Sequence, residues 1–408
     1  MSARPIDWRR NLYALWLAQL LTIIGFSLRT PFLPFFLADI GADSFASQAI
    51  WSGAINAGGA AVMAISAPFW GIVADRYGRR PMVLRAMFAG SITVSLMGLA
   101  QSPIQLLILR FIEGGFTGTV AASTTLVAST TPREQRGFSL GMMQMAVFSG
   151  ASIGPLFGGL LADFIGYRVA FLVAGSMLFL GGLIVLTQVR EDFQRPQPGA
   201  QAAGNGAPTL WVVLLGGAML AMIGVMFALR LSTSAVQPIM PLYVEQLAGA
   251  TGSVASLSGL TLGVAGLTSA VAAVLIGRRA DRVGHGKVLI VATVAAGLLF
   301  IPLGLAQAAW QLIIFNGLYG IAAGGVMPSA NSVVANLTPS ARRGAVFGFT
   351  TAATSLGGFI GPLGGALLAA AFDIRYVFFV AGAVTLLAAG WVAYTIRSGA
   401  ALELAEET

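Results

Sequence analysis

Twelve apolar runs, each long enough to cross a membrane as a helix, recur along this chain. A spanning helix needs about 20 apolar residues to cross about 30 Å of hydrocarbon. The runs are rich in Leu, Ala and Gly and show no period-two alternation, which favours helices over the strands of a membrane barrel. The expected spans are 11–37, 49–74, 83–101, 104–128, 138–163, 169–189, 211–246, 255–277, 287–306, 309–335, 344–372 and 376–397.

The composition excludes several kinds of chemistry. Apolar residues make up 57% of the chain and charged residues only 9%, and the chain contains no Cys. Disulfides and thiolate metal sites are therefore absent. His285 is the single histidine, so any histidine-based catalysis would depend on it alone. We expect a protein that is not an enzyme and that uses neither a cofactor nor a metal.

The distribution of positive charge predicts the orientation in the membrane. If both termini lie inside, the inner segments hold 18 Lys and Arg residues, whereas the outer loops hold only Arg168 and Arg375. Such a bias follows the positive-inside rule and accounts for the net charge of +8 without nucleic acid as a partner. The sequence predicts a multi-pass protein of the cell membrane (plasma or inner membrane) with both termini in the cytoplasm.

An internal repeat divides the chain into two halves. Asp75-Arg76 matches Asp281-Arg282 and Gly154-Pro155 matches Gly361-Pro362, at a nearly constant offset of 206 to 207 residues. The segment 188–209 is polar and rich in Pro, Gly, Gln and Ala, which is typical of a flexible linker. We therefore expect an all-α integral membrane protein with twelve transmembrane helices in two pseudo-symmetric six-helix halves. Residues 1–187 form the first half, residues 188–209 the cytoplasmic linker and residues 210–408 the second half.

Three motifs resemble those of one transporter family. GIVADRYGRR at 71–80 is similar to the signature loop between helices 2 and 3 of the major facilitator superfamily. LILRFIEGG at 107–115 resembles its helix 4 motif, and GASIGPLFGG at 150–159 resembles the helix 5 motif of its proton-driven antiporters. The third signal is less specific, because a related GFIGPLGG recurs at 358–365. The chain as a whole is similar to the bacterial twelve-span multidrug efflux branch, whose members are drug:proton antiporters.

The resemblance implies a conformational latch in the loop after helix 2. A carboxylate there can face the positive N-terminal end of a helix from the other half, while the arginines pair with acids such as those of the linker. The second copy has His285 where the first has Arg79, which puts a second latch in doubt, and a plain positive-inside turn is the alternative interpretation. The expected latch residues are Gly71, Asp75, Arg76, Gly78, Arg79, Arg80, Asp281 and Arg282.

Small residues at helical spacing in the fifth span let that helix bend and pack closely against a neighbour. The family uses this segment as a hinge and a seal, and close packing alone is an equally good explanation. The expected hinge residues are Gly150, Gly154, Pro155, Gly158 and Gly159.

Four ionisable side chains lie well inside the spans, where charge is expensive and function is the default hypothesis. They are Arg29, Arg110, Glu113 and Arg230. Arg29 lies about 12 Å from the outer end of its span, and Arg110 and Glu113 lie about 10 and 15 Å from the outer end of theirs. In the family that the chain resembles, helices 1 and 4 both line the cavity, which implies that these three residues can meet. We assign Arg29, Arg110 and Arg230 to the substrate cavity. A structural ion pair between Glu113 and one arginine is the alternative.

Glu113 and Arg110 are the expected proton-coupling residues. Glu113 is the only deeply placed carboxylate, and it stands where the helix 4 motif usually has Gln. A spacing of three residues puts both side chains on one face of a helix. Burial and the neighbouring guanidinium act on the carboxyl group in opposite directions, which suits a proton carrier.

Local features complete the prediction. The Pro-x-x-Pro pairs at 31–34 and 238–241 predict breaks in the first and seventh spans. Asp163 and Arg168 are expected to pair within an outer loop.

The sequence thus predicts a secondary active transporter that exports small amphipathic compounds or drugs by proton antiport and alternating access. Its expected partners are a small-molecule substrate, protons and the lipid bilayer, and a monomer is expected because each chain contains a complete pathway. The alternative is an importer or exchanger for an organic anion such as a phosphate or carboxylate, since guanidinium groups suit those ligands. A receptor or scaffold without transport is a third possibility.

Overall fold

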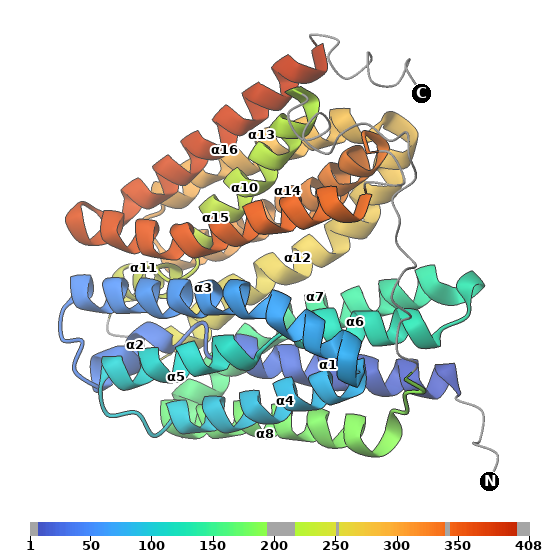
Figure 1. Cartoon of the computed structure of the whole chain (residues 1–408). Coiled ribbons are helices and arrows are strands. Elements are labelled where there is room, and N and C mark those ends of the chain that lie inside the picture. The colour runs from blue at the N-terminus through green and yellow to red at the C-terminus, as the bar shows by residue number, and fades with distance from the viewer. Residues whose placement is uncertain (1–6, 194–216, 250–252, 339–342, 398–408) are drawn as a thin grey trace. The chain divides into compact units, whose positions relative to one another are not determined.

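The computed structural model describes residues 7–193, 217–249, 253–338 and 343–397 of the 408-residue chain, and these contain helices but no strand (Figure 1). The helices in chain order are α1 (Trp8–Leu28), α2 (Leu33–Asp39), α3 (Phe45–Tyr77), α4 (Arg79–Met97), α5 (Pro103–Phe116), α6 (Thr119–Thr130), the short 3₁₀ helix η1 (Arg133–Gln135), α7 (Arg136–Ile165), α8 (Tyr167–Gln188), α10 (Gly217–Val236), α11 (Met240–Ala248), α12 (Val254–Val283), α13 (His285–Gly304), α14 (Ala309–Asn336), α15 (Arg343–Ala371) and α16 (Ile374–Arg397).

The predicted series of membrane spans appears as long apolar helices. Eleven stretches in the described residues are long and apolar enough to cross a membrane. The remaining expected span is α4, which has 19 residues and carries Arg79, Arg80 and Arg85 near its start, so its mean hydropathy is lower. The architecture agrees with the predicted all-α membrane fold and is consistent with twelve spans.

Two of the expected spans are interrupted at their Pro-x-x-Pro pairs, as predicted. α1 ends at Leu28 and α2 begins at Leu33, with Pro34 in the first turn of α2. α10 ends at Val236 and α11 begins at Met240. Proline lacks a backbone N–H and fixes its φ angle, so it fits the first turn of a helix and ends the one before it.

The fourth span is also interrupted, which the sequence analysis did not predict. α5 ends at Phe116, Thr117 is extended and Gly118 has a φ angle of 120°, after which α6 begins at Thr119. A φ angle of this size is readily adopted only by glycine. The span expected at 104–128 is therefore present as Pro103–Thr130, but it consists of two helices joined at Thr117 and Gly118.

The chain forms two compact units. Unit 1 comprises Met1–Ser44, Gly58–Pro198 and Gly249–Gly266, and unit 2 comprises Phe45–Ala57, Gly199–Ala248 and Leu267–Thr408. The first part of α3 therefore belongs to unit 2, and the first part of α12 belongs to unit 1. The expected halves 1–187 and 210–408 differ from these units by the two exchanged segments.

Each unit has its own apolar core. In unit 1, side chains of α1, α4, α6, α7 and α8 meet around fully buried residues such as Leu15, Met87 and Leu126. In unit 2, side chains of α10, α13, α14, α15 and α16 meet around residues such as Val225 and Val326. Without a hydrophobic driving force in lipid, such packing relies on close van der Waals contact.

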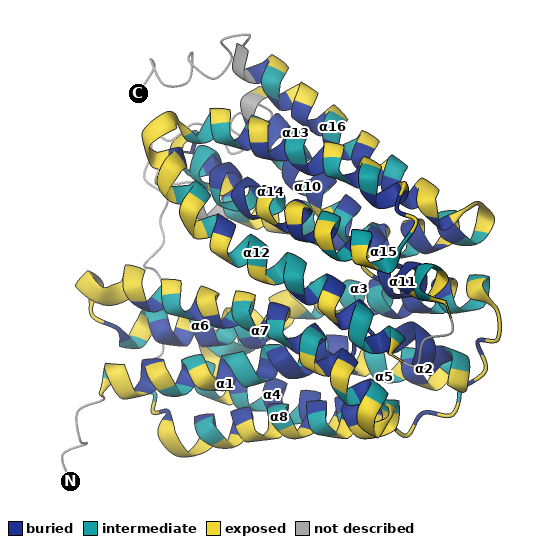
Figure 2. Ribbon diagram, turned by 180° about the vertical axis from the view of Figure 1, so that it is seen from behind, coloured by how far each residue is buried: buried dark blue, intermediate teal, exposed yellow. Residues whose placement is uncertain are grey.

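Exposed surface on the helices is largely apolar. Figure 2 shows exposed residues alternating with buried ones along the helices, and several exposed positions carry large apolar side chains. Phe164, Ile65 and Leu387 are 82%, 79% and 74% exposed. In water such residues would form aggregation-prone patches, whereas in a membrane they face lipid tails.

The predicted glycines of α7 allow close contact between helix backbones. A methyl group on Gly158 would lie 1.8 Å from the carbonyl oxygen of Leu28 in α1, and one on Gly154 would lie 2.7 Å from Ser27 Cβ. A methyl group on Gly150 would lie 2.8 Å from Ile23 Cβ. Residues four apart lie on one face of a helix, so these glycines form the surface on which α1 packs.

A second face of the same helix packs against the first part of α12. A methyl group on Gly159 would lie 2.2 Å from the carbonyl oxygen of Ala255, and one on Gly259 would lie 2.3 Å from that of Pro155. Four of the expected hinge residues thus pack on α1 or α12 through glycine Cα atoms, and Pro155 does so through its backbone carbonyl. Close packing is the property of these residues that the geometry shows.

Candidate functional site

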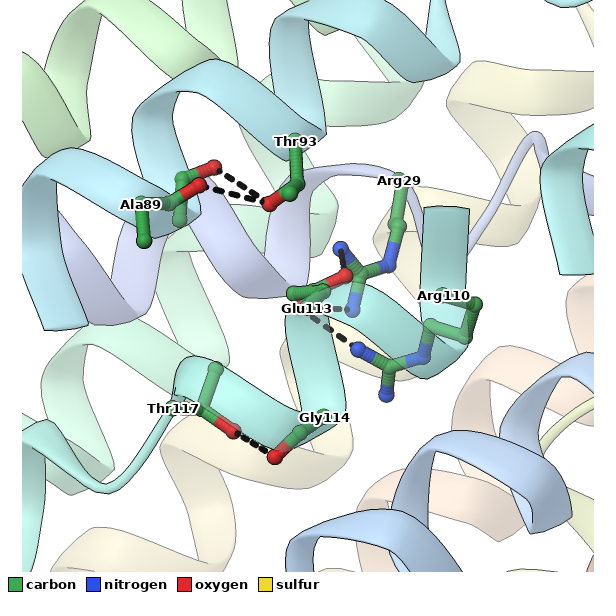
Figure 3. A network of polar contacts seen from close by, with 8 residues as sticks. Arg29, Ala89, Thr93, Arg110, Glu113, Gly114 and Thr117 are labelled. Atoms are coloured by element: carbon green, nitrogen blue, oxygen red, sulfur yellow. Dashed lines mark hydrogen bonds and ion pairs between the residues drawn. The ribbon is translucent and has the colours of Figure 1, made fainter. Parts of the chain in front are cut away.

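Arg29, Arg110 and Glu113 lie together inside unit 1 (Figure 3). Arg29 donates through both terminal nitrogens to Glu113, with 3.0 Å from Nη1 to Oε2 and 3.0 Å from Nη2 to Oε1. Arg110 Nη1 donates to Glu113 Oε1 at 2.6 Å. The Glu113 side chain is 1% exposed, against 7% for Arg29 and 18% for Arg110. We call these three residues the ion triad.

The local structure of two helices positions the triad. Arg29 follows the last residue of α1, directly after Leu28, whose carbonyl oxygen packs against Gly158 of α7. Arg110 and Glu113 lie one turn apart on α5 and share a face, as their spacing predicted. The alternative of one Arg–Glu pair is replaced by a carboxylate shared between two arginines.

Gly59 of α3 is a neighbour of the triad that the sequence analysis missed. A methyl group on Gly59 would lie 2.5 Å from Arg110 Nε and 2.8 Å from Arg110 Cζ. The Arg110 guanidinium therefore lies directly over the Cα atom of Gly59. The paired glycines at 58–59 were a signal for close approach, but the chain contains 52 glycines and most have other causes.

Arg230 lies in unit 2 and is not part of the triad. It belongs to α10, where its side chain is exposed and lies over α15. A methyl group on Gly358 would lie 3.3 Å from Arg230 Nε. Within the described residues no acidic side chain pairs with Arg230. Its positive charge is uncompensated there.

The interruption of the fourth span brings together a second polar cluster in unit 1. Trp70 Nε1 donates to the Gly115 carbonyl at 2.7 Å, and the Arg85 guanidinium lies 3.4 Å from the centroid of the Trp70 ring. Arg85 also donates to the Thr117 carbonyl at 3.4 Å. Carbonyl groups that the broken helix leaves unpaired are thus satisfied by side chains of α3 and α4. Trp70, Arg85 and Thr117 line a cavity of about 200 Å³ together with Arg79 and Gly118.

The expected latch loop contains a contact at the start of α4. Glu191, which follows α8, accepts hydrogen bonds from the backbone N–H groups of Arg79 and Arg80 at 2.9 and 2.7 Å. Gly78 has a φ angle of 97°, and a methyl group there would lie 2.9 Å from the same carboxylate. A linker acid therefore reaches the loop, as expected, but it binds backbone amides at a helix N-terminus and not the arginine side chains.

The other latch residues are placed as follows. Gly71 and Arg76 belong to α3, with Arg76 lying 5.5 Å from the ring centroid of Tyr77. Asp75 lies in α3, but its side chain is outside the described residues. In the second copy, Asp281 pairs with His285 at 3.3 Å while Arg282 is exposed. The latch therefore remains an expectation.

The expected pair of Asp163 and Arg168 is wrong, because each has another partner. Asp163 Oδ2 accepts the backbone N–H of Ser256 at 2.7 Å, since the close approach of α7 and α12 brings a free helix-terminal amide to the carboxylate. Arg168 donates to the carbonyl of Gly98 at 2.9 Å. Partial burial raises the pKa of the Asp39 carboxyl group at the end of α2, and the positive charge of Arg168 offsets only part of this rise.

No group of three or more metal-ligating side chains occurs within the described ranges.

Comparison with known protein families decides the classification. The model of the Major Facilitator Superfamily matches residues 15–260 and 222–407, which together cover most of the chain. The chain belongs to the major facilitator superfamily. It is a multi-pass membrane protein of a family of transporters, as its motifs predicted.

Curated relatives place the chain within this superfamily. It is 34% identical over 388 residues to the multidrug resistance protein MdtG of Salmonella heidelberg (strain SL476), covering 94% of each chain. It is 35% identical over 404 residues to MdtG of Enterobacter lignolyticus (strain SCF1), covering 99% of this chain and 96% of the relative. The predicted resemblance to the multidrug efflux branch is confirmed.

Solved structures share the fold at low sequence identity. A bacterial homolog of the human lysosomal transporter Spinster, in an inward-facing and occupied conformation, has a TM-score of 0.79 at 16% identity and covers 97% of this chain and 98% of its own. The human organic anion transporter MFSD10 (TETRAN) has a TM-score of 0.69 at 21% identity and covers 95% and 100%. These likenesses support the fold alone.

Proposed function

We propose that this protein exports small amphipathic compounds, drugs among them, by proton antiport and alternating access, with Glu113 as the proton carrier. The curated multidrug resistance relatives support the substrate class and the direction of transport. The observation that carries the coupling is the ion triad, in which one buried carboxylate is held by two guanidinium groups. A buried charge that is retained inside a membrane protein is expected to serve function.

The triad supplies a physical basis for exchange. An ionised carboxylate has about four acceptor sites, and three of those on Glu113 are occupied by Arg29 and Arg110. One site remains for either a proton or a donor group of the substrate, so the two compete. Glu113 is 1% exposed in this structure. A proton or a substrate group therefore binds it in another state, in which Arg29 or Arg110 has moved away.

The interruption between α1 and α2 provides such a movement. Arg29 lies at the broken end of α1, where four residues separate the two helices, while Arg110 lies within α5. A short turn rearranges more easily than the interior of a helix. We propose that Arg29 leaves the carboxylate in one state and returns in the other.

A second candidate function is transport of an organic anion, and the charge balance favours it. Arg29 and Arg110 share the single carboxylate of Glu113, so the ion triad carries an excess of positive charge, and Arg230 has no acidic partner among the described residues. Guanidinium groups bind carboxylates and phosphates in a bidentate manner. In that case an anion that attracts Arg110 frees Glu113 to take up a proton, and anion and proton move together.

The remaining expectations complete the proposal. We place the protein in the plasma or inner membrane with both termini in the cytoplasm, acting as a monomer. The loop with Asp75 serves as the inner latch, and the glycine-rich segment of α7 serves as the hinge and seal.

Reconstituted vesicles test the coupling. With an imposed pH gradient, the parent protein should release or take up protons when substrate is added, and the sign of the proton flux separates antiport from anion symport. Glu113→Gln keeps the size of the side chain and should retain substrate binding and substrate exchange without a gradient. It should lose the gradient-driven accumulation.

The matched control is Glu245→Gln in α11, which removes a carboxylate outside the triad and should leave transport unchanged. Full gradient-driven export by Glu113→Gln would contradict the assignment of the proton carrier. Loss of transport by Glu245→Gln alone would move the assignment to that residue.

A further inference from the structure

Unit 2 contains an apolar groove that the proposed transport mechanism does not use. It has a volume of about 510 Å³ and runs between α12, α13 and α14. Its floor contains the small residues Ala292, Ala295 and Ala322, and Val291 along its edge is 68% exposed. The groove is therefore open along its length and offers almost no polar group except at one end.

The length of the groove matches one leaflet of a bilayer. On α13 the lining residues recur from Lys287 to Leu299 at helical spacing. A rise of 1.5 Å per residue gives a length of about 18 Å. The hydrocarbon core is about 30 Å thick, so each leaflet contributes about 15 Å. An extended acyl chain of one leaflet therefore fits the groove from end to end.

Positive charge gathers at one end of the groove only. Lys287 lines the groove where α13 begins, next to Val283 at the end of α12. Arg278, Arg279 and Arg282 lie on the last turns of α12 and are exposed. In the described part of the chain none of these four cations forms an ion pair. The nearby Asp281 pairs with His285 instead.

We propose that this groove is a binding site for one anionic phospholipid, whose acyl chain lies along α13 and whose phosphate group binds Lys287. Each buried methylene adds to the affinity, and each lysine near an anionic headgroup adds more. The groove ends where α12 ends and α13 begins, and its cations lie at that end. The apolar lining supplies affinity for the chain, and the cations supply preference for a negative headgroup.

Native mass spectrometry of the purified full-length protein tests the site. The protein in detergent is titrated with phosphatidylglycerol or with phosphatidylcholine of the same chains. We expect one phosphatidylglycerol to remain bound after the other lipids have been removed, and phosphatidylcholine to bind more weakly.

Two substitutions test the acyl-chain contact and the headgroup contact one at a time. Val291→Trp fills the groove, and displacing as few as two methylenes should weaken binding about fifteenfold. Leu298→Trp is the matched control, because Leu298 is on the same helix, is 49% exposed and does not line the groove. Lys287→Gln should weaken phosphatidylglycerol about fivefold and leave phosphatidylcholine unchanged, whereas Lys287→Arg should bind like the parent.

Three results would overturn the proposal. Equal retention of both lipids would show that the cations do not select the headgroup. Equal effects of Val291→Trp and Leu298→Trp would show that the chain does not lie in this groove. Displacement of the bound phosphatidylglycerol by a transported compound, together with loss of that compound's binding in Val291→Trp, would assign the groove to the substrate.

Discussion

The contact between Gly59 and Arg110 allows a direct measurement of how the ion triad is held in place. In Gly59→Ala the new methyl group would lie 2.5 Å from Arg110 Nε, and its three nearest neighbours are all atoms of the Arg110 side chain. Since a side chain is more easily moved than a backbone, the guanidinium should shift. The 2.6 Å hydrogen bond to Glu113 should then be lost.

The size of the effect follows from two opposing contributions. A hydrogen bond between charged groups contributes about 1.5–3 kcal/mol. Replacing glycine by alanine within a helix returns up to about 1 kcal/mol. We expect the free energy of unfolding of Gly59→Ala to fall by about 0.5–2 kcal/mol.

A double-mutant cycle isolates the interaction. In the background of Arg110→Ala the methyl group meets no guanidinium, so Gly59→Ala should become neutral or stabilising, with a coupling energy of about 1.5–3 kcal/mol. Unfolding in mixed micelles, followed by tryptophan fluorescence, gives the four free energies. Gly115→Ala is the control, because its methyl group would lie 3.7 Å from Val62, an ordinary contact distance. The same loss in both backgrounds would refute the reasoning and point instead to strain between α3 and α5.

Two further predictions concern packing and capping. Gly158→Ala should lower the free energy of unfolding by about 3 kcal/mol or more, because its methyl group would lie 1.8 Å from the Leu28 carbonyl oxygen. Gly137→Ala on the same helix is the control: its methyl group would meet open space, so it should be neutral or stabilising in the same unfolding assay. Glu191→Gln should lower the free energy of unfolding by about 0.5–2 kcal/mol because the start of α4 loses its charged acceptor, and an unchanged thermal midpoint relative to the exposed neighbour variant Asp192→Asn would contradict this.

Features that depend on short sequence distances were predictable. The apolar runs gave the helices, and the Pro-x-x-Pro pairs gave the breaks after Leu28 and Val236. Depth counted from the helix ends brought Arg29 to the level of Arg110 and Glu113, and helical spacing placed the latter two on one face. Each of these inferences uses only the regular geometry of a helix in a layer of known thickness.

Features that depend on which helices are neighbours were not predictable. The break at Thr117 and Gly118 is stabilised by Trp70 and Arg85 from other helices, so the local sequence showed only a cluster of glycines. In the same way, the partner of Asp163 is the backbone of Ser256, 93 residues away. Arg168 was the predicted partner because it is the nearest opposite charge in the sequence. A free backbone amide at the start of a helix cannot be recognised from the residue type.

The exchange of segments between the two units has a consequence for how the protein is made. Unit 1 includes Gly249–Gly266, so its last packing surface, on Pro155 and Gly159 of α7, is covered only after residue 266 of 408 has been synthesised. Unit 2 includes Phe45–Ala57, which emerge from the ribosome long before the rest of that unit. Neither unit can therefore be completed from a single uninterrupted stretch of nascent chain. Residues 45–57 therefore remain without their packing partners until the rest of unit 2 has been translated.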